Sequence, residues 1–194
     1  MSIQQMFLGI GGGGDAYQIE KSLRFNEDDS AYLNRASSSD GSTTTFTWSG
    51  WVKRNKATSG YTYFLSSVLS PNVETICLNA DRFEFYQNYS GGVTSEALLR
   101  DPSAFYHLVC AVDTSQNTEA DRVKLYINGE VVTDFYQTYY PSEDRVMGIN
   151  KDTTVLKIGQ HYSTDDSDYQ LAEVHYIDGE QLTASDFGET NATT

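Results

Sequence analysis

The chain contains few cysteines. Cys77 and Cys110 are the only two among its 194 residues, which is too few for a disulfide framework. Both lie in apolar runs typical of strands, where a free cysteine behaves as a small apolar residue. We therefore expect two buried thiols, with a single disulfide as the alternative.

Basic residues are also scarce. The chain has 13 Lys and Arg against 27 Asp and Glu, which gives a formal net charge of −14. A charge of this sign repels phosphate backbones, so we expect no nucleic-acid partner. The acidic excess is compatible with cation binding, although a solvated acidic surface explains it more simply.

Long apolar segments are missing, so we expect no membrane insertion. Residues 1–10 contain no Lys or Arg and do not resemble a secretory signal peptide. They do contain an apolar cluster, which consists of Met6, Phe7, Leu8 and Ile10. Four glycines follow this cluster. One interpretation is a terminus that is disordered or tucked against its own domain. The other is an anchor arm whose apolar side chains are assembly contacts with a neighbouring subunit.

The clearest strand is Thr45–Lys53. Side chains in a strand alternate between two faces, so Phe46, Trp48 and Val52 share one side and are apolar enough to face a core. Trp51 falls on the opposite face, where a sheet with one solvent-exposed face usually has a polar residue. It either belongs to a binding surface or packs under a covering loop, and we expect the covering loop.

Strand patterns recur along the chain, and helix patterns are almost absent. Residues 75–78 and 82–86 flank a short turn and predict a hairpin, as do residues 22–25 and 31–33. Asn128-Gly129 is the strongest hairpin-turn signal, because a type I′ turn needs positive φ at both positions. About a dozen strands predict an all-β fold, a two-sheet antiparallel sandwich.

Four segments, in their order and spacing, resemble the concanavalin A-like, laminin-G-like jelly-roll superfamily: Phe46–Lys53, Phe105–Asp113, Arg122–Gly129 and Leu171–Gly179. The resemblance extends over residues 20–190 and implies a two-sheet jelly roll of the lectin/glucanase type. We therefore divide the chain into an arm at 1–18, one domain at 19–190 and a tail at 191–194.

Three further segments are similar to the version of this family found in marine and cyanobacterial bacteriophage structural proteins: Ser22–Leu33, Asp121–Tyr126 and Ala184–Thr190. This resemblance implies a non-enzymatic virion protein, such as a tail-fibre, appendage or capsid-decoration subunit at the particle surface. Its partners would be other virion proteins and further copies of itself, as a homo-oligomer. The chain departs from the family pattern at Tyr169, where a glycine is usual before the last strand.

Glucanases of this fold carry Glu-x-Asp-x-Glu or a close variant on one strand, and glycoside hydrolysis needs such paired carboxylates. Here Glu173 is followed by His175, and the next carboxylates, Asp178 and Glu180, fall in a turn. No pair of histidines has metal-ligand spacing, and no serine or cysteine lies in a nucleophile elbow. We therefore expect no enzymatic activity.

Many laminin-G-like domains hold one Ca²⁺, an ion that prefers oxygen ligands. The resemblance therefore makes calcium the cofactor to consider, although none is required. Two acidic clusters contain the candidate ligands: Asp28, Asp29, Asp166 and Asp168. Neither cluster has EF-hand spacing, and the alternative is that both are simply solvated.

Sugar binding uses aromatic faces for the ring and carboxylates or amides for the hydroxyls. The candidates lie in the later loops: Tyr139, Tyr140, Tyr162, Asp165 and Asn150. Loop tyrosines also suit contacts between subunits. The alternative function is therefore a lectin-like receptor-binding module that recognises host surface glycans.

Overall fold

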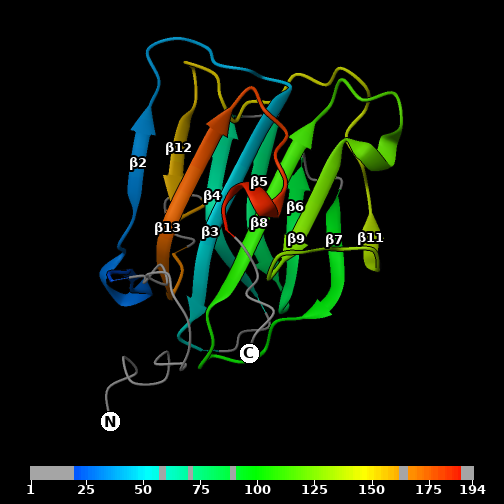
Figure 1. Cartoon of the computed structure of the whole chain (residues 1–194). Helices are drawn as coiled ribbons and strands as arrows, with labels where there is room; N and C mark the ends of the chain where they lie inside the picture. Colours follow the sequence, from blue (N-terminus) through cyan, green and yellow to red (C-terminus); the bar gives the residue numbers. More distant parts are fainter. Residues whose placement is uncertain (1–19, 57–59, 70–71, 88–90, 162–165, 189–194) are drawn as a thin grey trace, which may run out of the picture.

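Figure 1 shows the computed structural model of the chain, in which two β-sheets lie face to face. The structure describes residues 20–56, 60–69, 72–87, 91–161 and 166–188. Within these residues the helical structure is limited to three short 3-10 turns: η2 (Glu27–Asp29), η3 (Glu119–Asp121) and η4 (Ala184–Asp186). No helix in this part of the chain is long and apolar enough to cross a membrane.

The first sheet has six strands in the order β1-β13-β3-β8-β9-β10, with antiparallel neighbours. They are β1 (Leu23–Phe25), β3 (Thr45–Arg54), β8 (Tyr106–Asp113), β9 (Val123–Ile127), β10 (Glu130–Val131) and β13 (Tyr169–Asp178). The predicted antiparallel two-sheet sandwich is confirmed by this sheet and the second one.

The second sheet has seven strands in the order β11-β7-β6-β5-β4-β12-β2, also antiparallel. They are β2 (Leu33–Ala36), β4 (Tyr61–Leu69), β5 (Asn72–Asn79), β6 (Arg82–Gln87), β7 (Gly91–Leu98), β11 (Phe135–Thr138) and β12 (Val155–Ile158). In Figure 1 this sheet lies behind β3 and β8, with β2 and β11 at its two edges.

Aromatic side chains between the layers join the two sheets. Phe46, Trp48 and Val52 of β3 point inward and are buried, as strand alternation predicted. Trp48 stacks on Phe64 of β4 with ring centroids 5.8 Å apart, and Phe46 meets Phe85 of β6 edge-on at 6.1 Å. Each contact links one sheet to the other, so these rings hold the sandwich together.

One predicted hairpin is confirmed and the other is wrong. β5 and β6 pair directly through a turn at Ala80 and Asp81, both of which have positive φ. The expected pairing of residues 22–25 with 31–33 does not form, because β1 pairs with β13 and β2 pairs with β12 in the other sheet. Asn26 caps η2 between them, and this turn carries the chain from one sheet to the other.

Two other local predictions are confirmed. Asn128 and Gly129 have φ values of 53° and 89°, as a type I′ turn requires. Cys77 and Cys110 are free and buried. Burial raises the pKa of both thiols, so both stay protonated at neutral pH and behave as apolar side chains.

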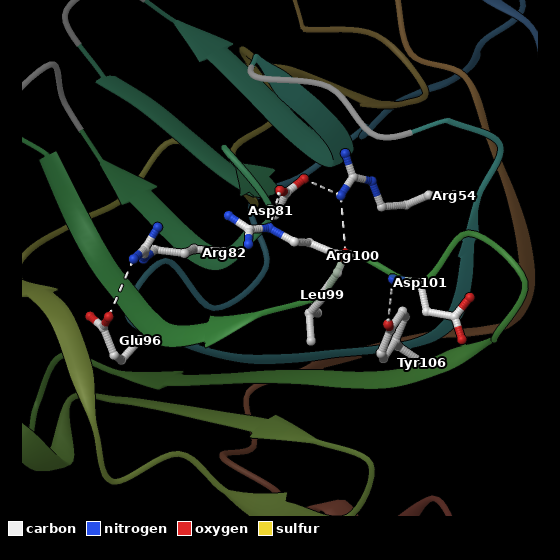
Figure 2. A network of polar contacts seen from close by, with 8 residues as sticks. All are labelled: Arg54, Asp81, Arg82, Glu96, Leu99, Arg100, Asp101 and Tyr106. Carbon is white, nitrogen blue, oxygen red and sulfur yellow. Dashed lines mark hydrogen bonds and ion pairs between the residues drawn. The ribbon is translucent and has the colours of Figure 1, made fainter.

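A polar network joins the end of β3 to the β5–β6 turn, and Figure 2 shows its residues. Arg54, at the end of β3, is buried and donates to the Asp81 carboxylate and, at 3.0 Å, to the Leu99 carbonyl. Arg100 donates to the other Asp81 oxygen at 3.1 Å. Because Asp81 belongs to the β5–β6 turn, Arg54 ties the six-stranded sheet to the seven-stranded one. Burial alone would raise the pKa of Asp81, but the hydrogen bonds from both arginines hold it below its ordinary value.

Asp81→Asn should lower the free energy of unfolding at neutral pH by about 3 kcal/mol, because it removes the charge of the carboxylate that pairs with the buried Arg54 guanidinium. The lowered pKa of Asp81 means that its contribution is present at neutral pH and is lost as the pH falls through that pKa. The difference between wild type and variant should therefore shrink in acid. Denaturant unfolding across this pH range measures it, with the exposed Asp134→Asn as control. Equal stability at neutral pH would contradict this role.

Candidate functional site

The segment that follows β13 and contains η4, here called the later segment, covers part of the outer face of the six-stranded sheet. Figure 1 shows this red segment, with η4, in front of β3 and β8. The Thr47 hydroxyl donates to the Glu180 carbonyl at 2.7 Å and accepts from the Leu182 N–H at 2.8 Å. The Gln181 amide donates to the Asp121 carbonyl at 2.8 Å. These bonds make much of this face an intramolecular contact.

Trp51 lies on this same outer face and is half-buried. Its ring stacks on His107 of β8 with centroids 5.0 Å apart, and His107 Nε2 is 2.9 Å from Ser49 Oγ. Ser49 is fully buried, so its hydroxyl cannot meet a substrate as a nucleophile must. Burial lowers the pKa of His107, so this ring is neutral at neutral pH. Trp51 therefore packs on a neighbouring strand, and its cover by a loop stays a prediction.

The outer face of the seven-stranded sheet carries a row of polar and aromatic side chains. The register pairs Cys77 of β5 with Glu84 of β6, and Glu84 with Thr94 of β7. Tyr63 of β4 pairs with Cys77, and Gln137 of β11 pairs with Thr94. Because Ile76, Phe85 and Val93 of the same strands face the core, alternation points this row outward.

Aromatic rings surround one end of this row. Tyr61 stacks on Tyr63 with centroids 5.6 Å apart and meets Tyr86 of β6 edge-on at 6.4 Å. His161, from the segment after β12, also stacks on Tyr63, with centroids 4.7 Å apart, and its Nδ1 is 3.2 Å from Thr75 Oγ1. Tyr61 is 42% exposed, so much of its ring faces solvent.

Glu84 is a buried carboxylate at the centre of the row. Its Oε1 accepts from Thr94 Oγ1 at 3.1 Å, and its Oε2 has no hydrogen-bond partner among the described residues. Gly92 lets it lie close to β7, since a Cβ there would be 2.8 Å from Glu84 Oε1 and 2.3 Å from the Phe85 carbonyl oxygen. A buried carboxylate oxygen without a hydrogen-bond partner costs stability.

Burial raises the pKa of Glu84, and hydrogen bonds from Asn79 and Thr94 offset this only in part. Burial also raises the pKa of Tyr61, and the charge of Glu84 adds to that effect. The Tyr61 phenol therefore stays protonated at neutral pH.

A second aromatic group lies on the β11 side of Glu84. Arg82 shares its side of β6 with Glu84, and its guanidinium lies 4.4 Å from the centre of the Tyr136 ring. Figure 2 shows the same arginine pairing with Glu96, at 3.3 Å. Tyr136 is 64% exposed, and Tyr139, which is 56% exposed, lies against Gly91. We call the combined surface the tyrosine face, and its members are Tyr61, Tyr63, Tyr86, Glu84, Thr94, Tyr136, Gln137 and Tyr139.

One of the five predicted sugar-binding residues, Tyr139, belongs to the tyrosine face. Tyr140 is partly buried and packs against the core. Asn150 is buried, and its amide donates to the Ser42 carbonyl at 3.2 Å and to the Asp178 carboxylate at 2.5 Å, so its donors are already used. The structure does not bring Asn150 to the tyrosine face. Tyr162 and Asp165 lie outside the described residues.

Lys56 lies beside two of the four predicted calcium ligands. A hydrogen bond to Glu27 raises the pKa of Lys56, and the charges of Asp168 and Asp28 raise it further. Lys56 itself pairs with Glu27, and Asp168 accepts a hydrogen bond from the Asn55 amide.

The other two predicted ligands accept hydrogen bonds from side-chain amides. Asp29 accepts from Asn26 at 2.8 Å, and Asp166 accepts from Gln160 at 2.7 Å. In the described ranges no group of three or more His, Cys, Asp and Glu side chains could hold a metal ion. Calcium binding stays a prediction that calorimetric titration with Ca²⁺ and with EDTA tests. The predicted assembly contacts lie outside the described residues: Met6, Phe7, Leu8 and Ile10.

Reasoning from the sequence did not single out Glu84, Tyr61 or Tyr86. Their signal was the alternation in β6, where Arg82, Glu84 and Tyr86 share one face and two phenylalanines share the other. That alternation predicts a strand with one buried face and one solvent-exposed face. It does not predict which strands lie beside it, and so the aromatic group around Glu84 could not be assembled from it.

Residues 25–185 match the family described as the concanavalin A-like lectin/glucanases superfamily, and this match spans most of both sheets. The chain belongs to this superfamily. The resemblance in the four strand segments is therefore confirmed. No curated protein sequence matches the chain.

Solved structures with the same fold are distant in sequence. The heptameric SAP-like pentraxin from Limulus polyphemus aligns with a TM-score of 0.52 and 13% identity over 75% of this chain and 68% of that one. The binding domain of botulinum neurotoxin DC in complex with SialylT aligns with a TM-score of 0.59 and 15% identity, over 87% of this chain and 42% of that one. Trypanosoma rangeli sialidase in complex with sialic acid aligns with a TM-score of 0.52 and 12% identity, over 75% of this chain and only 22% of that one. These similarities show the fold alone.

Glu84→Gln should raise the free energy of unfolding at neutral pH by about 1 kcal/mol, because it removes a buried charge with an unpartnered oxygen. The raised pKa of Glu84 means that the folded state holds its proton more tightly than the unfolded state does. Wild-type stability should therefore fall as the pH rises from the ordinary glutamate pKa through the raised one, and the variant should lose this part of the slope. Thermal unfolding measures both effects, with the exposed Glu130→Gln as control. A variant less stable than wild type at neutral pH would contradict the unpartnered state of Glu84.

Proposed function

We propose that the chain is a non-enzymatic carbohydrate-binding module whose ligand binds on the tyrosine face. The observation that carries this proposal is the set of exposed tyrosine rings on the outer face of the seven-stranded sheet, which belong to Tyr61, Tyr136 and Tyr139. Tyrosine rings offer apolar faces to the C–H groups of a sugar and phenol groups to its hydroxyls. The family is one of lectins and glucanases, which supports a sugar as the ligand.

Binding without hydrolysis is the better match to this face. Hydrolysis of a glycosidic bond needs two carboxyl groups on opposite sides of that bond. Glu84 is buried at the centre of the face, and Glu96 is paired with Arg82. The sialidase similarity covers only 22% of that enzyme, so it carries no argument for catalysis here.

The setting of this module is the second part of the proposal. The segments Ser22–Leu33, Asp121–Tyr126 and Ala184–Thr190 support a bacteriophage virion protein, such as a tail-fibre, appendage or capsid-decoration subunit. In that setting the module would contact other virion proteins and copies of itself, and its ligand would be a glycan of the host surface. Recognition of host glycans needs a stable sandwich and a binding face, and no reactive group.

Tyr61→Ala should weaken glycan binding about tenfold, because it removes an exposed ring from the tyrosine face. Binding of the full chain to a printed glycan array, followed by calorimetry on the bound sugars, measures this change. Tyr32→Ala is the matched control, because Tyr32 is 43% exposed and its ring contacts Lys157 at the far edge of the same sheet. Wild-type affinity in Tyr61→Ala, or an equal loss in both variants, would contradict the assignment of the site.

Mass spectrometry of purified virions should detect the chain in a fixed number of copies per particle, since a structural subunit has a defined place in the particle. Lysate from infected cells is the control for expression. Presence in the lysate together with absence from the particles would contradict the virion setting while leaving the binding face untouched.

A further inference from the structure

We infer that the free edge of β2 takes residues 6–10 of a second copy as an added strand, and that two copies exchange these segments to form a dimer. This inference rests on the proposed contact between copies and is independent of the tyrosine face. Three observations carry it. They are an unpaired strand edge, two exposed leucines beside it, and an apolar cluster that precedes β1 in the chain.

β1 and β2 end the two sheets at neighbouring edges. β1 is the last strand of the six-stranded sheet, and β2 is the last strand of the seven-stranded one. η2 joins them in the chain, and Phe25 of β1 lies against Gly159, which follows β12. Among the described residues, β12 is the only strand that pairs with β2. The other side of β2 therefore presents backbone N–H and C=O groups to which an extended segment can pair.

Two leucines at these edges face the interior and yet remain exposed. Leu23 of β1 pairs with Leu171, and Leu33 of β2 pairs with Ile158. Both partners pack in or against the core, and residues opposite each other in a ladder share a face. Leu23 is nevertheless 57% exposed and Leu33 49% exposed in the structure of the single chain. We therefore assign their cover to a second copy, and we call these leucines and the free side of β2 the leucine edge.

The apolar cluster of residues 6–10 suits both faces of such an added strand. In an extended segment its even-numbered residues share one face, and Phe7 lies on the other. The first set would cover the two leucines. Phe7 would lie on the outer face of the sheet, where Val155 of β12 is 43% exposed opposite the small Ala36 of β2.

The connection between the cluster and β1 is long enough for an exchange. Residues 11–22 begin with four glycines, and a Gly-rich random coil of this length spans about 20 Å on average. The two sheets of a sandwich are only about 10 Å apart, so this length can cross to a copy whose leucine edge faces it. Each connection starts at β1, beside the leucine edge of its own copy, and so a two-fold dimer can exchange both segments through identical contacts. Residues 1–14 carry no charged side chain, so the acidic surface of the second copy does not repel them.

Sedimentation velocity of the full chain tests this dimer. We expect Leu8→Asp and Leu33→Asp each to weaken it about tenfold or more, because each places a charge in the apolar contact. Ser2→Asp is the control for charge at the start of the chain. Val131→Asp is the matched control for the edge, because Val131 is 47% exposed on β10, at the other edge of the six-stranded sheet.

The outcomes separate this inference from the proposed function. A dimer that survives Leu8→Asp or Leu33→Asp, with each variant folded by its melting temperature, would overturn the exchange and leave self-association standing. A monomer at every concentration would overturn the contact between copies as well, and would leave sugar binding untouched.

A disulfide identifies which copy supplies the added strand. Cys77 and Cys110 are free and buried, so Leu8→Cys and Leu33→Cys in one chain introduce a pair of thiols that can be oxidised selectively. We expect oxidation to give a linked dimer on a denaturing gel without reductant, and each single variant is the control. A link within one chain, which runs as a monomer, or no link at all would overturn the second copy as the occupant of the leucine edge.

Discussion

The aromatic contacts between the sheets, Trp48 on Phe64 and Phe46 on Phe85, are the interaction on which the rest of the structure depends. A strand has two faces, and these contacts use the inner face of both sheets. The outer faces are then free to differ. The later segment covers much of the six-stranded sheet through Thr47, whereas tyrosine rings remain exposed on the seven-stranded sheet. The functional surface therefore follows from which outer face the chain leaves uncovered.

Two buried glutamates on this sheet differ in how their oxygens are partnered. Glu74 of β5 faces inward, accepts from Arg145 at 3.2 Å and from the Gly148 N–H at 3.0 Å, and so has a partner for each oxygen. Glu84 of β6 faces outward and has a partner for one oxygen only. Burial raises the pKa of both, so burial alone does not distinguish them. The oxygen of Glu84 that lacks a partner among the described residues is covered as well, so the two glutamates differ in the cost of their burial.

The strands and the family were predictable from the sequence, because alternation and turn residues are local signals. Phe46 and Trp48 were placed in the core correctly, and Asn128-Gly129 formed the expected turn. The partners of each strand were not predictable in the same way. Residues 22–25 and 31–33 look like a hairpin along the chain, but they join different sheets. Pairing between distant strands is a property of the whole fold.

The binding face depends on such distant pairing, and so most of it was missed. Tyr139 was singled out because it lies in an aromatic loop, but Tyr61, Glu84 and Tyr86 look like ordinary strand residues along the chain. They come together only through the order of β4, β5 and β6. Asn150 shows the converse: an amide in a promising loop that the fold uses to join Ser42 to Asp178.

Hydrogen–deuterium exchange of the full chain, with and without the sugar that it binds most tightly, tests the central claim most directly. The account predicts that the sugar slows exchange in β4, β6 and β11, whose outward residues form the tyrosine face, and leaves β3, β8 and β9 unchanged. Slower exchange confined to the six-stranded sheet, or to the β2 edge, would contradict it.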